Sequence, residues 1–287
     1  MASMRDIKRR KNSIQGTQQI TKAMKLVSTV KLQRARANAE RSKTYFECMY
    51  QTVNSILSRI GHVEHKYLLP GSSQKKAVIA ITSNRGLAGG YNTNITKLIT
   101  RQESWNSEDI VVYAIGNKGR EVLAKAGYEI KEDLPEMIET PCYEDAMCLA
   151  GRLLDAFAAD EIGEIYLAYT SFKNTVSHEP KLLKLLPIEY EQNAESAEGD
   201  GHSLMNFEPE DTEALDMIVP KYITSLIYGA MMEAVASENG ARMQAMDNAT
   251  SNAEEMISDL ALKYNRARQG SITQELTEII AGAEALG

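Results

Sequence analysis

The sequence predicts an α/β protein with one long helix at each end and a sheet-containing region between them. All seven prolines fall between positions 70 and 220, so the first 69 and the last 67 residues contain none. Short runs rich in β-branched residues alternate with helical stretches in the middle of the chain. Proline interrupts helices and β-branched runs favour strands, so we expect three parts, over residues 1–60, 74–191 and 208–287.

The last third of the chain is rich in strong helix formers. Residues 221–285 contain alanine, methionine, leucine, glutamate and arginine throughout, and only three aromatic side chains, Tyr222, Tyr228 and Tyr264. A helix over these residues would be roughly 100 Å long at 1.5 Å per residue. A helix of that length needs a partner, because isolated helices gain little stability from propensity alone.

The first 60 residues predict the partner helix. Small and apolar side chains recur there at a spacing of seven or in positions that widen the same stripe: Ile7, Ile14, Thr21, Ser28 and Ala35, widened by Met24, Val27 and Leu32. A stable two-stranded coiled coil would repeat leucine or isoleucine instead. The pattern therefore predicts close approach of a second helix, with much of the remaining surface left to other contacts.

If both helices dock to the same end of the middle region, they run antiparallel. Aligning their bases places Met24 near Met243 and Met1 near Arg266, and leaves about 20 residues as an overhang of roughly 30 Å. The apolar side chains of this overhang are Ile272, Leu276, Ile279, Ile280, Ala281, Ala283 and Leu286. So much apolar surface on a lone helix predicts a socket in another protein.

The middle region predicts a mainly parallel sheet. The expected strands cover residues 77–82, 110–115, 128–130, 165–172 and 182–190, and the expected helices cover residues 93–102, 118–126 and 143–159. Strands that alternate with helices imply βαβ units.

The loop at residues 83–91 follows the first strand, where a phosphate or dinucleotide would bind. Its glycines, Gly86, Gly89 and Gly90, match neither G-x-G-x-x-G nor a P-loop. The favoured interpretation is a glycine-rich turn that permits close packing, and no cofactor is expected.

No catalytic or metal-binding arrangement is legible. His62 and His65 share a segment without a Cys or third His, and we interpret that segment as a solvated linker. Cys142 and Cys148 are six apart and do not share a helical face. His178 and His202 stand alone, so no catalytic constellation can be assigned from the residues.

Charge is distributed unevenly along the chain. Residues 1–36 carry ten Lys or Arg and one acid, whereas residues 185–220 carry ten acids and no Lys or Arg. The basic first helix could bind nucleic acid, anionic lipid or an acidic protein surface. Three cysteines without a framework predict a reducing compartment, and no apolar run or signal sequence is evident, so any membrane association is expected through a partner.

Three stretches resemble the gamma subunits of F-type ATP synthases. They are TQQITKAMKLVS at residues 17–28, TSNRGLAGGYN at residues 82–92, and ARMQAM at residues 241–246 together with NRARQGSITQELTEI at residues 265–279. The third stretch is the most specific, and together they mark both ends and the middle of the chain. Asn84 stands where the family often has Asp, and Ala88 where it often has Cys. The cysteine-bearing insertion of chloroplast members is not visible around Cys142 and Cys148.

The resemblance implies a central-stalk rotor. It implies an antiparallel coiled coil of the terminal helices inside a hexamer of α and β subunits, and a Rossmann-like middle domain that binds no nucleotide. That domain would contact the epsilon subunit and the c-ring, through which ion movement drives rotation and ATP synthesis. The implied location is the cytoplasmic face of the cell membrane, as a peripheral part of the F1 sector.

The resemblance also implies partner-binding residues. Met24 and Arg242 would lie at the contact with the lever segment of the β subunit. Four residues would meet β-subunit loops nearer the tip: Arg268, Gln269, Thr273 and Glu275. Phe207 and Glu208 would lie near the foot that meets the c-ring.

Two other functions remain open from the residues alone. A Rossmann-type oxidoreductase would explain only the middle region and predicts binding of a dinucleotide. A nucleic-acid-binding protein would explain only the basic first helix and predicts salt-dependent affinity for duplex DNA, against which the acidic remainder weighs.

Overall fold

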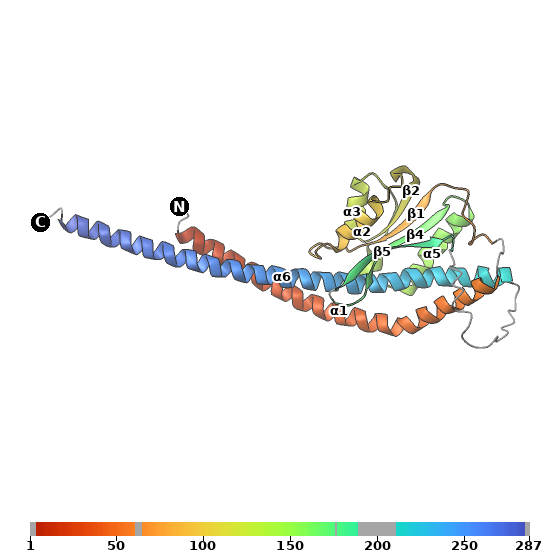
Figure 1. The fold of residues 1–287 in the computed structure, drawn as a ribbon, viewed down its shortest axis with the longest axis horizontal. Helices are drawn as coiled ribbons and strands as arrows, with labels where there is room; N and C mark the ends of the chain where they lie inside the picture. Colours follow the sequence, from red (N-terminus) through yellow and green to blue (C-terminus); the bar gives the residue numbers. More distant parts are fainter. Residues whose placement is uncertain (1–3, 61–64, 176, 189–210, 285–287) are drawn as a thin grey trace. The chain divides into compact units, whose positions relative to one another are not determined.

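A computed structural model describes residues 4–60, 65–175, 177–188 and 211–284 (Figure 1). The chain forms two compact units, one of Met1–Thr29 with Arg242–Gly287 and one of Val30–Ala241. Two long helices contribute to both units: α1, Met4–Ile60, has 57 residues, and α6, Asp211–Glu284, has 74. The division into residues 1–60, 74–191 and 208–287 stays a prediction.

A five-stranded sheet forms the centre of the larger unit. Its strands are β1 (Lys76–Ile81), β2 (Ile110–Ile115), β3 (Glu129–Asp133), β4 (Glu164–Phe172) and β5 (His178–Leu186), in the order β3-β2-β1-β4-β5. The pairs β1–β2, β1–β4 and β2–β3 are parallel, and β5 returns antiparallel to β4. The first four strands have the order of a Rossmann fold, with an added antiparallel edge strand.

Both faces of this sheet are covered, which explains why its central strands are continuous apolar runs. β2 is buried along its whole length, and β1 is buried after its first residue. The helices α2 (Tyr91–Thr100) and α3 (Asn117–Lys125) pack on one face, where Ile95, Ile99 and Leu123 are buried. The other core contains α5 (Tyr143–Ala158), the short α4 (Glu136–Glu139) and the first part of α6. A 3₁₀ turn, η1 (Ser107–Asp109), leads into β2.

The first part of α6 packs in the sheet core through a stripe at helical spacing. Its fully buried side chains there are Leu215, Val219, Ile223, Ile227 and Met231. They recur every four residues, which places them along one face of an α-helix. Val53 of α1 belongs to the same buried cluster. α6 is therefore a core helix of the sheet domain as well as a terminal helix.

The predicted fold class is confirmed: an α/β domain of Rossmann-like strand order with long N- and C-terminal helices that pair in antiparallel fashion. The last strand is shifted, because β5 spans His178–Leu186 and not residues 182–190. Pro180 lies inside it, and an edge strand tolerates proline because one side of its backbone needs no ladder hydrogen bond. Among the described residues, no helix is long and apolar enough to cross a membrane.

Candidate partner-binding surfaces

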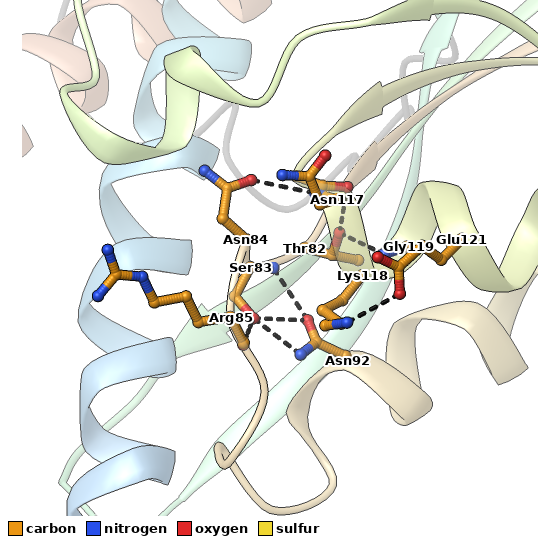
Figure 2. Close-up of polar contacts among 10 residues, drawn as sticks. Thr82, Ser83, Asn84, Arg85, Asn92, Asn117, Lys118, Gly119 and Glu121 are labelled. Carbon is orange, nitrogen blue, oxygen red and sulfur yellow. Dashed lines mark hydrogen bonds and ion pairs between the residues drawn. The ribbon is translucent and has the colours of Figure 1, made fainter.

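The loops that follow β1 and β2 pack directly on each other, at the edge of the sheet where a Rossmann fold binds its ligand. The hydroxyl of Thr82 donates a hydrogen bond to the Gly116 carbonyl (3.1 Å) and accepts one from the Gly119 N–H (2.9 Å) (Figure 2). The Asn117 N–H donates to Asn84 Oδ1 (3.0 Å). The first N–H groups of α3, which a helix could offer to an anion, thus have acceptors in the chain's own loop.

The same loop is also tied to the start of α2. The Ser83 N–H donates to Asn92 Oδ1 (2.9 Å), and the Ser83 hydroxyl donates to the Arg85 carbonyl (2.7 Å) (Figure 2). On the other side, Asn84 Nδ2 donates to the carbonyl of Pro135 (2.8 Å). These bonds join three segments of the sheet domain at one point, so the loop acts as a structural joint.

Two glycines permit this close packing. A Cβ atom on Gly116 would stand 2.2 Å from the Thr82 carbonyl oxygen, and one on Gly119 would stand 2.6 Å from the Thr82 side chain. Gly116 also has φ +107°, which favours glycine. The interpretation of the loop at residues 83–91 as a glycine-rich turn that permits close packing was misplaced. An added Cβ on Gly86 would meet nothing within 4 Å, and one on Gly90 would only touch Asn94, whereas the close packing is at Gly116 and Gly119 of the loop after β2.

The histidine segment differs from its prediction. His62 lies outside the described residues, but His65 is buried, with 7% of its surface exposed, and is not part of a solvated linker. Its Nε2 lies 3.4 Å from Asp216 Oδ1, and burial lowers the pKa of His65 against the attraction of that carboxylate. A hydrogen bond from Lys66, at 2.8 Å, lowers the pKa of Asp216. Within the described ranges, no group of three or more His, Cys, Asp or Glu side chains could hold a metal ion.

The smaller unit is an antiparallel pair of helix segments. Three polar contacts set its register: Gln18 with Glu254 (3.0 Å), Thr21 with Thr250 (2.8 Å) and Lys25 with Asp247 (2.6 Å). The predicted register, with Met24 near Met243, was wrong. Lys25, the residue after Met24, pairs with Asp247, which lies four residues beyond Met243. If α1 keeps this register along its length, the unpaired end of α6 is shorter than the predicted overhang by about one helical turn.

The predicted seam of α1 is confirmed in most positions. Thr21 and Ser28 are buried, Ile7 and Ile14 are partly buried, and the matching buried side chains of α6 in this unit are Met246, Ala253 and Leu260. Val27 was expected in the seam but is 57% exposed, because a stripe at seven-residue spacing is narrower than the one we assumed.

We expect a disulfide to test this register. In a variant without the three native cysteines, Thr21→Cys with Thr250→Cys should cross-link under mild oxidation, because the two hydroxyl oxygens are 2.8 Å apart and the residues face each other. Met24→Cys with Met243→Cys serves as the control and should cross-link much more slowly. The readout is the mobility of the chain in a non-reducing gel, and preferential cross-linking of the control pair would contradict the register.

Six of the predicted partner-binding residues lie in the smaller unit. Met24 and Arg242 are partly buried, and four residues beyond the paired region are exposed: Arg268, Gln269, Thr273 and Glu275. Phe207 and Glu208 lie outside the described residues. The structure thus places the first six within one unit, and their contacts with partners stay a prediction.

The end of α6 presents an apolar face that the chain leaves uncovered. Its exposed side chains are Ile272 (49%), Leu276 (55%), Ile279 (68%) and Ile280 (59%). At 3.6 residues per turn, these four and the four exposed predicted residues fall within about 160° of the helix circumference. Apolar and polar candidates for partner binding therefore share one side of the tip.

The beginning of α1 adds a basic and partly apolar surface. Lys8, Arg9 and Arg10 are exposed, and Arg9 forms an ion pair with Asp6 at 3.1 Å. Farther along, Ile20 is 62% exposed and Leu26 is 63% exposed. Exposed apolar groups of this size, interleaved with basic ones, are typical of a surface that binds another protein.

Comparison with known proteins gives matches over the full chain. The family described as ATP synthase matches residues 3–286. A protein of Lachnoclostridium phytofermentans called "ATP synthase gamma chain" is 64% identical, over 100% of both chains. A protein of Acetobacterium woodii called "ATP synthase gamma chain, sodium ion specific" is 37% identical, over 99% of both chains.

Solved structures show the same fold. A chain of the mitochondrial ATP synthase of Euglena gracilis, from a structure of OSCP, F1 and c-ring, matches with a TM-score of 0.69 at 18% identity, over 99% of this chain and 94% of that one. A chain from the central stalk and c-ring of the Tetrahymena thermophila enzyme matches with a TM-score of 0.59 at 22% identity, over 80% of this chain and 99% of that one.

Proposed function

This chain belongs to the ATP synthase family as one of its gamma chains, and on that premise we propose where it meets the other subunits. It is the non-catalytic rotor subunit of the central stalk of F1Fo ATP synthase. It turns within the hexamer of α and β subunits and couples ion movement through the c-ring to ATP synthesis or hydrolysis. Its partners are the α and β subunits, the epsilon subunit and the c-ring.

The uncovered apolar side of the tip supports a binding site inside the hexamer. Of the sixteen large apolar side chains that are exposed among the described residues, nine lie in the smaller unit, which is about a quarter of the chain. Exposed isoleucine and leucine side chains gain about 1.5–3 kcal/mol each when they are fully buried. The smaller unit is therefore the part that the α and β subunits surround.

The residues inferred from the family motifs take specific roles in this proposal. Met24 and Arg242 meet the lever segment of a β subunit, and the exposed residues near the tip, Arg268, Gln269, Thr273 and Glu275, meet loops of the β subunits. Phe207 and Glu208 belong to the foot near the c-ring. The exposure of the four tip residues supports their part of the proposal, since each is available to a partner.

The larger unit has other partners in the proposal. It contacts the epsilon subunit and the c-ring, and it stands at the cytoplasmic face of the cell membrane as a peripheral component. The packing of the Thr82 loop against Gly116 supports a structural role for the Rossmann-like domain. The Thr82 hydroxyl occupies the position at the start of α3 where an anion would bind.

Co-purification tests the function as a whole. The tagged chain should bring down the α, β, epsilon and c subunits in one complex, and the complex should couple ATP hydrolysis to ion pumping. A chain recovered as a monomer, or one that binds a dinucleotide at equilibrium, would contradict the proposal and favour the oxidoreductase alternative.

We expect the basic cluster of α1 to contribute to assembly. Reversing Lys8, Arg9, Arg10 and Lys11 to Glu should weaken association with the hexamer, most clearly at low salt, where exposed charges are least screened. The measurement is the affinity of the purified variant for a preformed hexamer of α and β subunits at two ionic strengths. Reversal of Lys97, Arg101 and Lys125 on the sheet domain is the control, and equal affinities of both variants would remove the special role of the cluster.

A further inference from the structure

The sheet domain holds α6 by a short series of contacts just before the smaller unit begins. The carboxylate of Glu233 accepts a hydrogen bond from the Phe172 N–H at the end of β4 (3.1 Å). The hydroxyl of Tyr91 donates to the Ala234 carbonyl (3.3 Å), and the Ser237 hydroxyl donates to the Thr170 carbonyl (3.2 Å). These contacts come from the start of α2 and from β4, so two segments of the domain hold the same stretch of helix, about one and a half turns long.

A steric contact completes the series one turn farther on. A Cβ atom on Gly240 would stand 2.7 Å from Cε1 and 3.0 Å from Nε2 of His178, the first residue of β5. The imidazole is thus pressed against the bare backbone of α6. It also lies beside the Phe172 ring, 5.9 Å away between ring centroids, and near the backbone of Thr175. Among the described residues neither ring nitrogen, both of which are buried, forms a hydrogen bond with α6, so the contact with Gly240 is one of shape.

The contacts lie on one side of α6. Residues 233, 237 and 240 are separated by three or four positions, which places them along one face of an α-helix, and residue 234 lies about 100° farther round. Ser237 and Asn239 are buried there although both are polar, and Ala234 and Ala236 are buried as well. Small side chains let the sheet domain approach the helix closely over this stretch.

Their geometry suits the transmission of torque. Apolar packing resists separation of a helix from a sheet but is non-directional, so it opposes rotation of the helix about its own axis less than directional contacts do. The hydrogen bonds of Glu233 and Ser237 are directional, and the imidazole of His178 fits only where Gly240 leaves room. Together they fix the rotation of α6 about its axis as well as its distance from the sheet. The series ends at Gly240, two residues before Arg242, where the smaller unit resumes.

We propose that these contacts, with His178 seated on Gly240 at their end, are the joint through which the sheet domain turns α6. The proposal rests on the rotor function and adds the residues that carry torque out of the sheet domain. Glu233, Ser237, Gly240 and His178 are positioning residues in this role. They fix the rotation of α6 about its own axis within the sheet domain, and they touch no nucleotide.

A pair of complementary substitutions tests the joint in the complete, membrane-reconstituted complex. Gly240→Ala adds a methyl group that collides with the imidazole, and His178→Ala in the same chain removes the collision. The readout is the ratio of ions pumped to ATP hydrolysed. We expect Gly240→Ala to lower this ratio, and the double variant to recover it by at least about twofold relative to Gly240→Ala alone, the lower end of the coupling found between contacting residues.

The control separates the joint from a general effect of alanine in a helix. Gly151 of α5 has open space at its Cβ position, so Gly151→Ala should pump as the unsubstituted complex does. Subunit stoichiometry is measured for every variant, because a misfolded sheet domain would lose partners, whereas a slipping joint would not. An unchanged ratio in Gly240→Ala, or no recovery in the double variant, overturns the joint. Failure of the unsubstituted complex to assemble or pump would overturn the rotor function instead.

Discussion

Removal of residues 272–287 is expected to leave the sheet domain folded while it weakens assembly or coupling of the ATP synthase complex. The deleted segment includes Ile272, Leu276, Ile279 and Ile280, each about half exposed or more. None of them belongs to either buried core cluster of the sheet domain. The chain therefore loses little of its own stability, whereas the complex loses the apolar surface that the other subunits cover.

The size of the effect follows from the burial that the partners supply. Full burial of one leucine or isoleucine is worth about 1.5–3 kcal/mol, and the segment offers four such side chains. Even partial burial corresponds to more than about tenfold in affinity, because about 1.4 kcal/mol changes a dissociation constant tenfold. The measurements are the thermal midpoint of the isolated chain, the yield of complex and the ratio of pumping to hydrolysis.

Point substitutions separate the apolar face from the length of the tip. Leu276→Ser, Ile279→Ser and Ile280→Ser together should reproduce most of the deletion phenotype. Gln274→Ser, Thr277→Ser and Glu278→Ser, which change exposed polar positions in the same stretch, should have little effect. A truncated chain that assembles and couples like the intact one would show that no socket receives this segment.

The second large effect is expected for Gly116→Ala in the loop joint. The new Cβ would stand 2.2 Å from the Thr82 carbonyl oxygen, and the backbone would have to hold φ +107° with a side chain present. Strain of this kind costs about 1–3 kcal/mol, and overpacking costs a further amount of about 1–3 kcal/mol. We expect a loss of several kcal/mol in the free energy of unfolding of the sheet domain.

Gly127→Ala is the matched control for that substitution. Gly127 also has a positive φ, +90°, but an added Cβ would meet nothing within 4 Å. It should therefore show the conformational cost alone, of about 1–3 kcal/mol. Urea denaturation followed by circular dichroism measures both variants. Equal losses would mean that the loops after β1 and β2 can separate without cost, contrary to the contacts of Thr82.

The elements that the sequence predicted best are those with a strong local signal. The buried strand β2 was predicted with its observed limits, because Ile110–Ile115 is a continuous apolar run that ends before Gly116. The strand β5 was misplaced because it begins at His178, in a polar stretch with a proline. Its position is decided by pairing with β4 and not by its own composition.

Tertiary contacts explain what the sequence could not supply. The burial of His65 depends on α6, which brings Asp216 to it from 151 positions away. The register of the paired helices depends on contacts such as Thr21 with Thr250, which no pattern within one helix reveals. The contact between Gly240 and His178 also joins distant parts of the chain. A single glycine in a predicted helix indicates only a low helix propensity and does not reveal which side chain packs against it.

The continuity of α6 limits how the chain can change in length. Its 74 residues run through both units without an intervening loop. One residue inserted after Gly240 would advance everything beyond it by about 1.5 Å and turn it by about 100° relative to the preceding turns. Ile279, for example, would point to another side of α6 than it now does relative to Gly240. Insertions of seven residues come closest to preserving the phase, so we expect length variation among relatives to concentrate in loops of the sheet domain.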